Sequence, residues 1–280
     1  LTGANSGLGA SAAVSLLEAG AKLTVVIRNP ENTDAMQAHF IRAAGRPADY
    51  VELADLSLLS DVNELCDRLL AEDRPIDVLI NNAGALFNEF AMTTEGIERS
   101  VALLLLSPWR MTERLLPLLE HHDSPARVIN VVSGGMYTQR LDCDHLIMSE
   151  AEYNGAIAYA RAKRALTVLT ELWSEEWRTK RVVVNSMHPG WADTPGVQSA
   201  LPGFRRITQT VLRSSEEGAD TIVWLARARE AATLSGKLFL DREPRTPHLR
   251  KSTKEPSGAR ENLLPWLRST YAALPVEGSS

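Results

Sequence analysis

Short apolar runs alternate along the chain with longer segments of helical periodicity. The runs are rich in Val, Ile and Leu, which is typical of parallel strands buried on both faces. They predict strands over residues 23–27, 50–54, 76–80, 127–132, 182–184 and 237–240. The segments between them predict helices over residues 10–19, 33–44, 60–71, 95–120, 155–178 and 215–229. This alternation favours a single α/β domain with a doubly wound parallel sheet and helices on both faces.

The two ends of the chain fit such a domain differently. A glycine-rich loop begins at Thr2, so Leu1 would be only the last residue or so of the strand expected before the loop. Without that central strand its neighbours keep buried backbone groups unpaired, which is costly. The first strand is largely missing from the chain, so we expect either that the natural chain extends upstream or that its start is misassigned. We assign residues 1–241 to the domain and residues 242–280 to a C-terminal extension, irregular over 242–260 and helical over 262–273.

Composition and charge argue against several classes of protein. The 280 residues are 44% hydrophobic and 23% charged, as in an ordinary soluble protein. A net charge of -5 gives no support for nucleic-acid binding, which usually shows as a basic patch. The apolar run at 101–106 is far too short to span a bilayer and no signal peptide is visible, so we expect a cytoplasmic protein. Cys66 and Cys143 predict reduced thiols, and no cluster has metal-ligand spacing.

A glycine-rich loop, Thr-Gly-Ala-Asn-Ser-Gly-Leu-Gly, precedes the first predicted helix. Glycines permit a tight turn and close approach of the backbone to a pyrophosphate, and the helix N-terminus offers free N–H groups. Glycines also punctuate ordinary turns, but the helix, strand and helix that follow favour a dinucleotide site. The residues predicted to bind the cofactor here are Thr2, Gly3, Asn5, Ser6, Gly7, Leu8 and Gly9.

The ends of the next two strands indicate which dinucleotide is bound. Arg28 follows the run 23–27, where NAD-binding proteins usually carry a carboxylate. An arginine there can pair with the 2′-phosphate of NADP(H), so NADP is favoured while NAD and a solvated surface arginine stay open. Asp55, with Leu56 beside it, is placed to accept a hydrogen bond from adenine. Capping of the next helix by Asp55 is the rival interpretation.

Of the five tyrosines, only Tyr159 has a lysine four residues later, Lys163. On a helix, positions i and i+4 share a face. A phenol has a pKa of about 10, and a neighbouring ammonium should lower it by stabilising the phenolate. The phenol would then exchange a proton with a substrate oxygen while a hydride moves to or from a nicotinamide. Such a pair alone is common and usually structural. The residues expected near it determine whether it is catalytic.

The residues expected near Tyr159 and Lys163 lie at the carboxyl ends of predicted strands, where open α/β sheets bind ligands. Small residues after the strand at 76–80 let the backbone lie against a cofactor. Ser133 follows the strand at 127–132, where its hydroxyl can hydrogen-bond a substrate carbonyl. We therefore predict Ser133, Tyr159 and Lys163 as catalytic residues, the last two also contacting the cofactor. The further cofactor-binding residues predicted at these strand ends are Asn82, Ala83, Gly84, Pro189, Gly190 and Thr194.

These motifs resemble those of the short-chain dehydrogenases/reductases. The chain matches, in order, the family's glycine loop, its Asn-Asn-Ala-Gly turn at 81–84, its active-site serine and its Tyr-x-x-x-Lys pair. The stretches 133–136, 186–196 and 202–204 resemble one subgroup of the family. The resemblance implies a Rossmann fold and redox chemistry between a carbonyl and an alcohol. It also implies Tyr159 as the general acid/base, Lys163 as a ribose ligand that tunes Tyr159, and Ser133 as the residue that orients the substrate.

Leu104 departs from the family pattern. The family places an asparagine in the helix before the serine strand, and its amide holds a water that relays protons from the lysine. In this chain that position falls on Leu104, whose side chain cannot hydrogen-bond a water. Either the relay uses another route or turnover is slow. The stretch 103–106 is interpreted as helix core, and Pro108 should distort the helix locally.

Three hypotheses follow. The first is an NADP(H)-dependent oxidoreductase acting on a small, apolar carbonyl or alcohol. The second, motivated by Leu104 and the shortened first strand, is a cofactor-binding protein with weak or no turnover. The third is a dehydratase or epimerase that reuses the tyrosine and lysine. We expect His188 to be structural and Trp173 and Trp177 to be core or dimer contacts, and the resemblance leaves a homodimer or homotetramer open.

Overall fold

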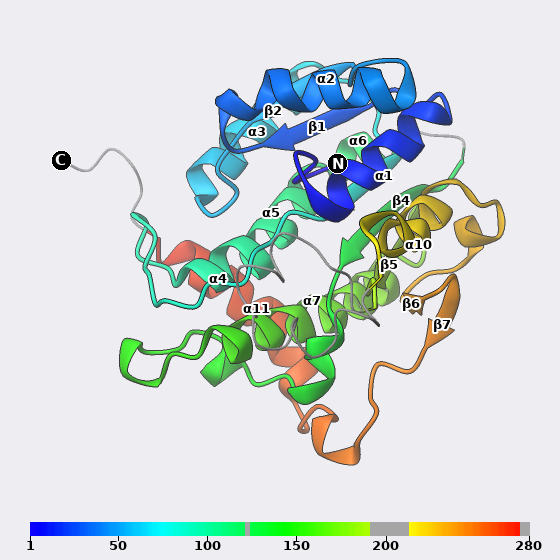
Figure 1. The fold of residues 1–280 in the computed structure, drawn as a ribbon. Coiled ribbons are helices and arrows are strands. Elements are labelled where there is room, and N and C mark those ends of the chain that lie inside the picture. The colour runs from blue at the N-terminus through cyan, green and yellow to red at the C-terminus, as the bar shows by residue number, and fades with distance from the viewer. Residues whose placement is uncertain (121–123, 191–212, 275–280) are drawn as a thin grey trace.

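A mostly parallel sheet runs through the middle of the molecule (Figure 1). The structure is a computed structural model that describes residues 1–120, 124–190 and 213–274. β1 pairs with β2, and the other strands follow in the order β3-β4-β5-β6-β7, with only β7 antiparallel to its neighbour among the described strands. The predicted α/β fold is confirmed. The strands are β1 (Thr24–Ile27), β2 (Tyr50–Leu53), β3 (Val78–Asn81), β4 (Ala126–Val131), β5 (Val182–Met187), β6 (Leu238–Leu240) and β7 (Glu243–Arg245).

Residues 1–3 join the two groups of strands. The N–H of Thr2 donates to the carbonyl of Ile80 in β3 at 3.0 Å, and the N–H of Gly3 donates to the carbonyl of Val26 in β1 at 2.9 Å. Thr2 also forms a parallel bridge with Val26. The first strand is thus reduced to these few residues, as predicted, and they place the glycine loop at the carboxyl ends of β1 and β3.

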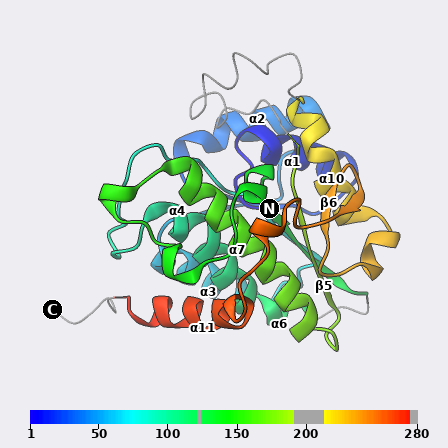
Figure 2. The same ribbon diagram turned by 90° about the horizontal axis from the view of Figure 1, so that it is seen from below.

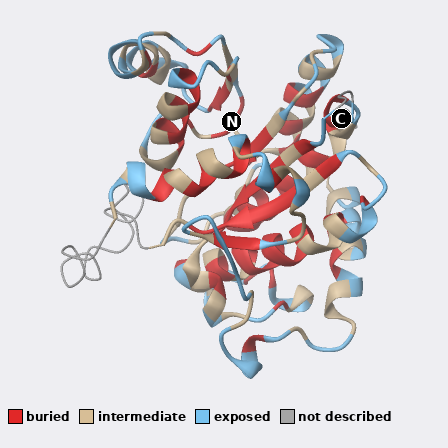
Figure 3. Ribbon diagram, turned by 90° about the vertical axis from the view of Figure 1, so that its right-hand side faces the viewer, coloured by how far each residue is buried: buried red, intermediate tan, exposed pale blue. Residues whose placement is uncertain are grey.

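Helices cover both faces of the sheet because successive strand residues point to opposite sides. In β1, Val25 and Ile27 belong to one hydrophobic core, whereas Val26 belongs to the other. Figure 3 shows the buried strands and the buried inner sides of the helices that cover them. The helices of the first core are α1 (Gly7–Glu18), α2 (Thr33–Ala44) and α10 (Ser215–Arg227), and those of the second include α3 (Leu59–Ala71), α5 (Ser107–Arg114) and α7 (Gly155–Glu176).

Capping residues set where two of these helices begin. A capping box begins α10: the N–H of Glu217 donates to Ser214 Oγ at 3.2 Å, and the N–H of Ser214 donates to the Glu217 carboxylate at 2.9 Å. At the start of α7, Asn154 Oδ1 accepts a hydrogen bond from the N–H of Ile157 at 3.1 Å. This cap places Tyr159 and Lys163 near the N-terminal end of α7.

The helix predicted over residues 95–120 is interrupted. It begins as α4 (Arg99–Val101), passes through a π-helical turn (Ala102–Leu106), continues as α5 and ends with α6 (Leu116–Leu119). Pro108 has no N–H to donate to the carbonyl of Leu104, and its ring crowds that carbonyl. The widened π turn accommodates this conflict, so the distortion predicted from Pro108 is found immediately before it.

The C-terminal extension contains more regular structure than the sequence predicted. Within the stretch 242–260, predicted to be irregular, β7 pairs antiparallel with β6 and places Pro244 opposite Phe239. The last helix, α11 (Ala259–Ala272), begins earlier than predicted and lies alongside α7 (Figure 2). It buries Leu263 and Leu267 in the same core as α7.

Candidate functional site

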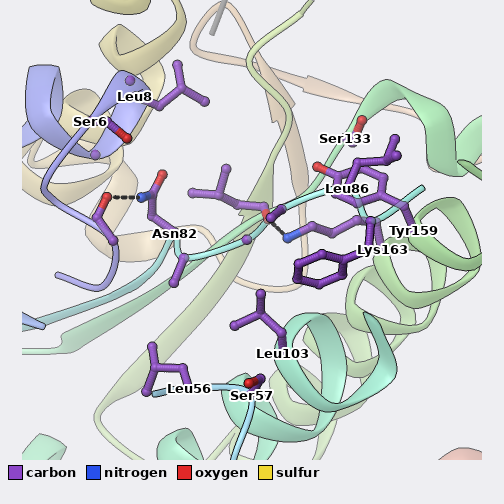
Figure 4. Close-up of a pocket in the computed structure, with 18 of the residues that line it drawn as sticks. Ser6, Leu8, Leu56, Ser57, Asn82, Leu86, Leu103, Ser133, Tyr159 and Lys163 are labelled. Carbon is purple, nitrogen blue, oxygen red and sulfur yellow. Dashed lines mark hydrogen bonds between the residues drawn. The ribbon is translucent and has the colours of Figure 1, made fainter. Parts of the chain in front are cut away.

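A cavity of about 640 Å³ opens at the carboxyl ends of the parallel strands. Figure 4 shows Ser6, Leu8 and Asn82 at one end of it and Ser133, Tyr159 and Lys163 at the other. Thr194, predicted to bind the cofactor, lies outside the described residues. The predicted site residues that line the cavity are Gly3, Asn5, Ser6, Gly7, Leu8, Gly9, Arg28, Asp55, Leu56, Asn82, Ala83, Gly84, Ser133, Tyr159, Lys163, Pro189 and Gly190.

Two positions in the glycine loop leave no room for a side chain. Gly3 has a φ of 69°, and a Cβ built on it would lie 2.9 Å from the Cα of Ala83. A Cβ on Gly9 would lie 2.0 Å from the carbonyl oxygen of Gly3. Backbone therefore packs directly against backbone, which only glycine permits at these positions.

Thr2, predicted to bind the cofactor, does not line the cavity and holds its wall together from behind. The side chain is 2% exposed. Its Oγ1 accepts hydrogen bonds from the N–H groups of Asn82 at 3.0 Å and Ala83 at 2.9 Å. The Asn82 amide in turn donates to the carbonyls of Thr2 at 2.9 Å and Gly3 at 3.1 Å. These bonds fix the Asn-Asn-Ala-Gly turn against the glycine loop.

The N-terminus of α1 begins at this loop and has no side-chain cap. Ser6 is the N-cap residue, but its side chain accepts no hydrogen bond from the helix, and the first turn of α1 contains no acidic residue. The first N–H groups and the positive end of the helix dipole therefore remain available to an anion. Together with the close packing at Gly3 and Gly9, this arrangement fits the pyrophosphate of a dinucleotide.

Arg28 lies at the end of β1, exposed and beside the cavity. Its Nε donates to the Asn29 side-chain oxygen at 3.3 Å, and it forms no ion pair with any residue that the structure describes. A guanidinium without a carboxylate partner is suited to bind an added phosphate.

Asp55 lines the cavity and is held by the chain that follows it. Its Oδ1 accepts hydrogen bonds from the N–H of Ser57 at 2.9 Å and from the Ser57 hydroxyl at 2.7 Å. The rival interpretation, in which Asp55 caps the next helix, is wrong. Helix α3 begins at Leu59, and its first N–H groups, those of Leu59 and Ser60, donate to the Glu95 carboxylate at 2.7 Å each.

Tyr159 and Lys163 lie on one side of α7 and meet Ser133 at the end of the cavity (Figure 4). Ser133 lies close enough to Tyr159 to lower the pKa of its phenol. The Ser133 hydroxyl also accepts the N–H of Gly135 at 3.2 Å, which orients it. Lys163 is only 3% exposed, and its Nζ donates to the carbonyl of Val131 at 2.7 Å.

The ionisation of this pair differs from the prediction. Burial raises the pKa of Tyr159 above its usual value, and the neighbouring Ser133 offsets only part of this effect. Burial lowers the pKa of Lys163 to about 8. The predicted net lowering of the Tyr159 pKa is therefore not found, because desolvation outweighs any effect of the Lys163 ammonium. The ammonium binds the Val131 carbonyl and lies 5.8 Å from the centre of the Tyr159 ring, so desolvation dominates.

Leu104 is fully buried in the π turn beside the catalytic end of the cavity. A Cβ built on Gly84 would lie 2.9 Å from a methyl group of Leu104 and 3.6 Å from Nζ of Lys163. An apolar side chain thus fills the space next to Gly84 on the side of the lysine. The prediction that 103–106 is helix core is confirmed for residues 104–106, whereas Leu103 is only partly buried.

His188 supports the turn that follows β5. It is 7% exposed, its Nδ1 accepts the N–H of Gly190 at 3.4 Å, and its ring meets Tyr137 edge-on at 5.7 Å between centroids. Burial, followed by the nearby charge of Arg213, lowers the pKa of His188 to about 4. A neutral imidazole that holds Gly190 at the cavity wall agrees with the structural role predicted for it.

Apolar side chains form another part of the wall, and sequence reasoning missed them as site residues. They are Leu86, Phe87 and Leu103. The guanidinium of Arg99 lies over the Phe87 ring at 3.8 Å, which fixes that ring from behind. Leu103 was predicted as core but is only partly buried. The available signals were weak: Leu86 and Phe87 come soon after the Asn-Asn-Ala-Gly turn, and Leu103 differs from its leucine neighbours only in where it points.

The sequence matches the protein family described as short chain dehydrogenase over residues 1–203. The chain belongs to this family. Human dehydrogenase/reductase SDR family member 12 is 37% identical over 265 residues, which cover 94% of this chain and 82% of the human protein. This protein and its relatives are the subgroup that the stretches 133–136, 186–196 and 202–204 resemble. The similarity is confirmed over nearly the whole chain.

Two further proteins extend the comparison. Mouse retinol dehydrogenase 14 is 31% identical over 257 residues, covering 86% of this chain and 76% of the mouse protein. Among solved structures, the Pseudomonas aeruginosa RhlG/NADP active-site complex has a TM-score of 0.68 and 25% identity, covering 85% of this chain and 92% of that chain. Membership of this family therefore supports oxidoreductase chemistry with a nicotinamide cofactor.

Outside the cavity, the described residues include two cysteines and a pair of stacked tryptophans. Cys66 and Cys143 are free, as predicted, and burial raises the pKa of their thiols to about 12 and about 11. No group of His, Cys, Asp or Glu within residues 1–120, 124–190 and 213–274 is arranged to hold a metal. No helix in these ranges is long and apolar enough to cross a membrane. Trp173 and Trp177 stack inside the core at 5.2 Å between centroids.

Proposed function

We propose that this protein is an NADP(H)-dependent oxidoreductase that interconverts a carbonyl and an alcohol on a small, apolar substrate. One observation carries the proposal: Tyr159, Lys163 and Ser133 converge on one end of a cavity whose other end is an uncapped helix N-terminus. The bound cofactor supplies or accepts the hydride, and the chain supplies orientation and the proton.

The chain's own residues divide the cofactor between them. The glycine loop and the first turn of α1 would hold the pyrophosphate, and Asp55 and Leu56 would meet the adenine. Arg28, exposed and free of ion pairs with described residues, would bind a 2′-phosphate. Lys163 would bind the nicotinamide ribose. The RhlG/NADP complex supports the choice of NADP over NAD.

The proton chemistry favours carbonyl reduction. Because burial raises the pKa of Tyr159, its phenol is protonated at neutral pH and can donate to a carbonyl oxygen. The Ser133 hydroxyl lies beside the same phenol at the cavity wall, so both hydroxyls can reach one substrate oxygen. The Lys163 ammonium then stabilises the phenolate that remains after proton transfer.

The cavity wall supports an apolar substrate. Leu86, Phe87 and Leu103 present hydrocarbon next to the catalytic residues. Retinol, after which the related mouse protein is named, is an apolar alcohol. We infer that the substrate places its carbonyl at Tyr159 and Ser133 and its apolar part against these three side chains.

Titration and turnover together test the proposal. NADPH and NADH are titrated by fluorescence, and NADPH oxidation is then followed with a panel of aliphatic and aromatic carbonyls. We expect NADPH to bind more tightly than NADH. Tyr159→Phe should lower kcat on the order of 10²- to 10⁴-fold while cofactor binding is kept. Turnover unaffected by Tyr159→Phe would refute the mechanism, and tighter binding of NADH would refute the role of Arg28.

Leu104 favours a second candidate function, cofactor binding with weak or no turnover. Its methyl group occupies the space next to Gly84 and Lys163, where the family relay would require a polar side chain. NADPH binding without oxidation by any carbonyl of the panel would identify this function.

A further inference from the structure

Arg164 is a buried cation that forms no ion pair with a carboxylate of the described residues. It follows Lys163 on α7 and is fully buried. Its guanidinium donates to three backbone carbonyls, those of Met136 at 3.0 Å, Gln139 at 3.0 Å and Pro247 at 2.7 Å. No described carboxylate lies within ion-pair distance of it. The carboxylates of Glu255 and Glu171 act on this charge only from beyond ion-pair distance. Burying a charge on neutral hydrogen-bond acceptors is costly, and an apolar side chain would pack there more cheaply. The positions of the three carbonyls therefore indicate which segments the buried Arg164 guanidinium holds together.

Two of these carbonyls belong to the loop that carries Ser133. The 3₁₀ turn Gly134–Thr138 follows Ser133 directly, and Met136 and Gln139 lie within it and just after it. The carbonyl of Ser133 accepts the N–H of Met136 at 3.0 Å, so this turn is continuous with the catalytic serine. The planar guanidinium reaches both carbonyls from the far side of the loop.

The third carbonyl belongs to residues 246–255, which we call the C-terminal strap. Figure 2 shows this part of the chain running past α7 toward α11. The Tyr137 hydroxyl donates to the carbonyl of Thr246 at 2.9 Å, a second link between the serine loop and the strap. Within the strap, His248 pairs with Glu255 at 3.0 Å. The strap lies beyond residue 203, where the match to the family ends.

We propose that Arg164 is a positioning residue that holds the Ser133 loop in its reactive geometry and couples that loop to the C-terminal strap. This inference rests on the proposed function, because it assigns a purpose to the orientation of Ser133. Arg164 touches neither the cavity nor any reacting atom, and its effect is transmitted through the carbonyls of Met136 and Gln139. A loss of this clamp leaves the cofactor end of the cavity intact, since its residues come from other elements.

The test compares Arg164→Met and Arg164→Lys with Arg161→Met in the full chain. Arg161 is the matched control: it lies on the same helix and donates to a single surface carbonyl, that of His145, at 2.8 Å. We expect Arg164→Met to lower kcat for carbonyl reduction on the order of ten- to a hundredfold, with the affinity for NADPH unchanged. Arg164→Lys keeps the charge but not the planar fork, so it should restore part of kcat. Arg161→Met should behave like the wild type.

A second readout does not need turnover. Hydrogen exchange is measured at the amides of Gly135, Met136 and Gln139, which are hydrogen-bonded within the loop. Exchange should be faster in Arg164→Met and unchanged in Arg161→Met. If Arg164→Met does not fold, Arg164→Lys and Tyr137→Phe, which removes the bond to Thr246, carry the same comparison.

The outcomes separate this inference from the proposed function. If the wild type reduces no carbonyl, the proposed function fails, while faster loop exchange in the Arg164 variants still supports the clamp. Unchanged exchange together with wild-type kcat in Arg164→Met overturns the inference. So does an equal loss of kcat in Leu65→Ala, a core variant in α3, at the same loss of thermal stability, because the effect would then be general destabilisation.

Discussion

Replacing Leu104 with asparagine tests whether the apolar filling beside Lys163 limits catalysis. Leu104 is fully buried, and its methyl group and Nζ of Lys163 both lie within 4 Å of the position that a Cβ on Gly84 would occupy. An amide at residue 104 would place a hydrogen-bonding group on the side of Gly84 that now offers only hydrocarbon. We expect Leu104→Asn to raise kcat because protons lost by Tyr159 are then replaced through Lys163 more quickly.

The same substitution should destabilise the fold, and the structure sets the magnitude. Removing a fully buried leucine side chain forfeits about 2 kcal/mol of hydrophobic burial. Leaving a buried amide only partly hydrogen-bonded costs about 1–3 kcal/mol more. We therefore expect Leu104→Asn to lower the free energy of unfolding by about 3–5 kcal/mol. A higher kcat together with a lower free energy of unfolding in Leu104→Asn would indicate that Leu104 limits catalysis.

Urea unfolding and single-turnover reduction of the best carbonyl measure the two effects. Leu104→Ala is the matched control, because it removes the methyl groups without adding an amide. It should lose about 2–5 kcal/mol of stability and show no gain in the proton-transfer step. If Leu104→Asn and Leu104→Ala have the same turnover, residue 104 does not limit proton supply and the reasoning is refuted.

Three other substitutions test the cofactor end and the fold. Gly9→Ala places a Cβ 2.0 Å from the Gly3 carbonyl oxygen, so it should weaken NADPH binding by about tenfold or more in fluorescence titration, whereas Ser11→Ala on the same helix should not. Arg28→Ala should weaken NADPH binding on the order of tenfold and leave NADH binding unchanged; an equal loss for both cofactors contradicts its role at the 2′-phosphate. Glu95→Ala removes the carboxylate that binds the N–H groups of Leu59 and Ser60, so it should cost about 1–2 kcal/mol in urea unfolding, and an unchanged midpoint would show that water caps α3 as well.

The parts of the fold that could be predicted from the sequence are those set by local signals. Continuous runs such as 23–27 have the composition of a strand buried on both faces, and Ser214 with Glu217 carries its own capping signal. The catalytic candidates were accessible for a related reason. Strand ends converge at one edge of a parallel sheet, so the order of motifs along the chain is enough to bring Ser133 and Tyr159 together.

What could not be predicted depends on distant parts of the chain. The cap of α3 comes from Glu95, 36 residues away from Leu59, so the neighbouring Asp55 was the more plausible cap by sequence. Arg164 finds its acceptors in Met136, Gln139 and Pro247, and no local pattern encodes three backbone carbonyls. The predicted lowering of the Tyr159 pKa was not found for the same reason. Desolvation is a property of the packed site and not of the spacing between two residues.

The buried charge of Lys163 should cost this protein stability, and the pH dependence of unfolding reveals it. Burial lowers the pKa of Lys163 from 10.5 to about 8, so the unfolded chain holds this proton more tightly than the folded one. The penalty, about 3 kcal/mol, is present in full below pH 8 and disappears as the pH rises toward the unfolded value. Relative to Lys163→Met, the wild type should therefore gain about 3 kcal/mol in free energy of unfolding between pH 7 and pH 10.5. Both variants are compared by urea unfolding across this range.

The test depends on how the difference in free energy of unfolding between the wild type and Lys163→Met changes with pH, and not on its absolute size. Lys163→Met also removes the hydrogen bond to the Val131 carbonyl, an offset that is the same at every pH at which the amine can donate. A difference that stays constant from pH 7 to pH 10.5 would show that Lys163 is not buried as a cation. If the difference narrows as expected while Lys163→Met loses turnover, then the ammonium is retained against its effect on stability. That combination is expected of a charge placed to stabilise the phenolate of Tyr159, and a merely structural lysine would not produce it.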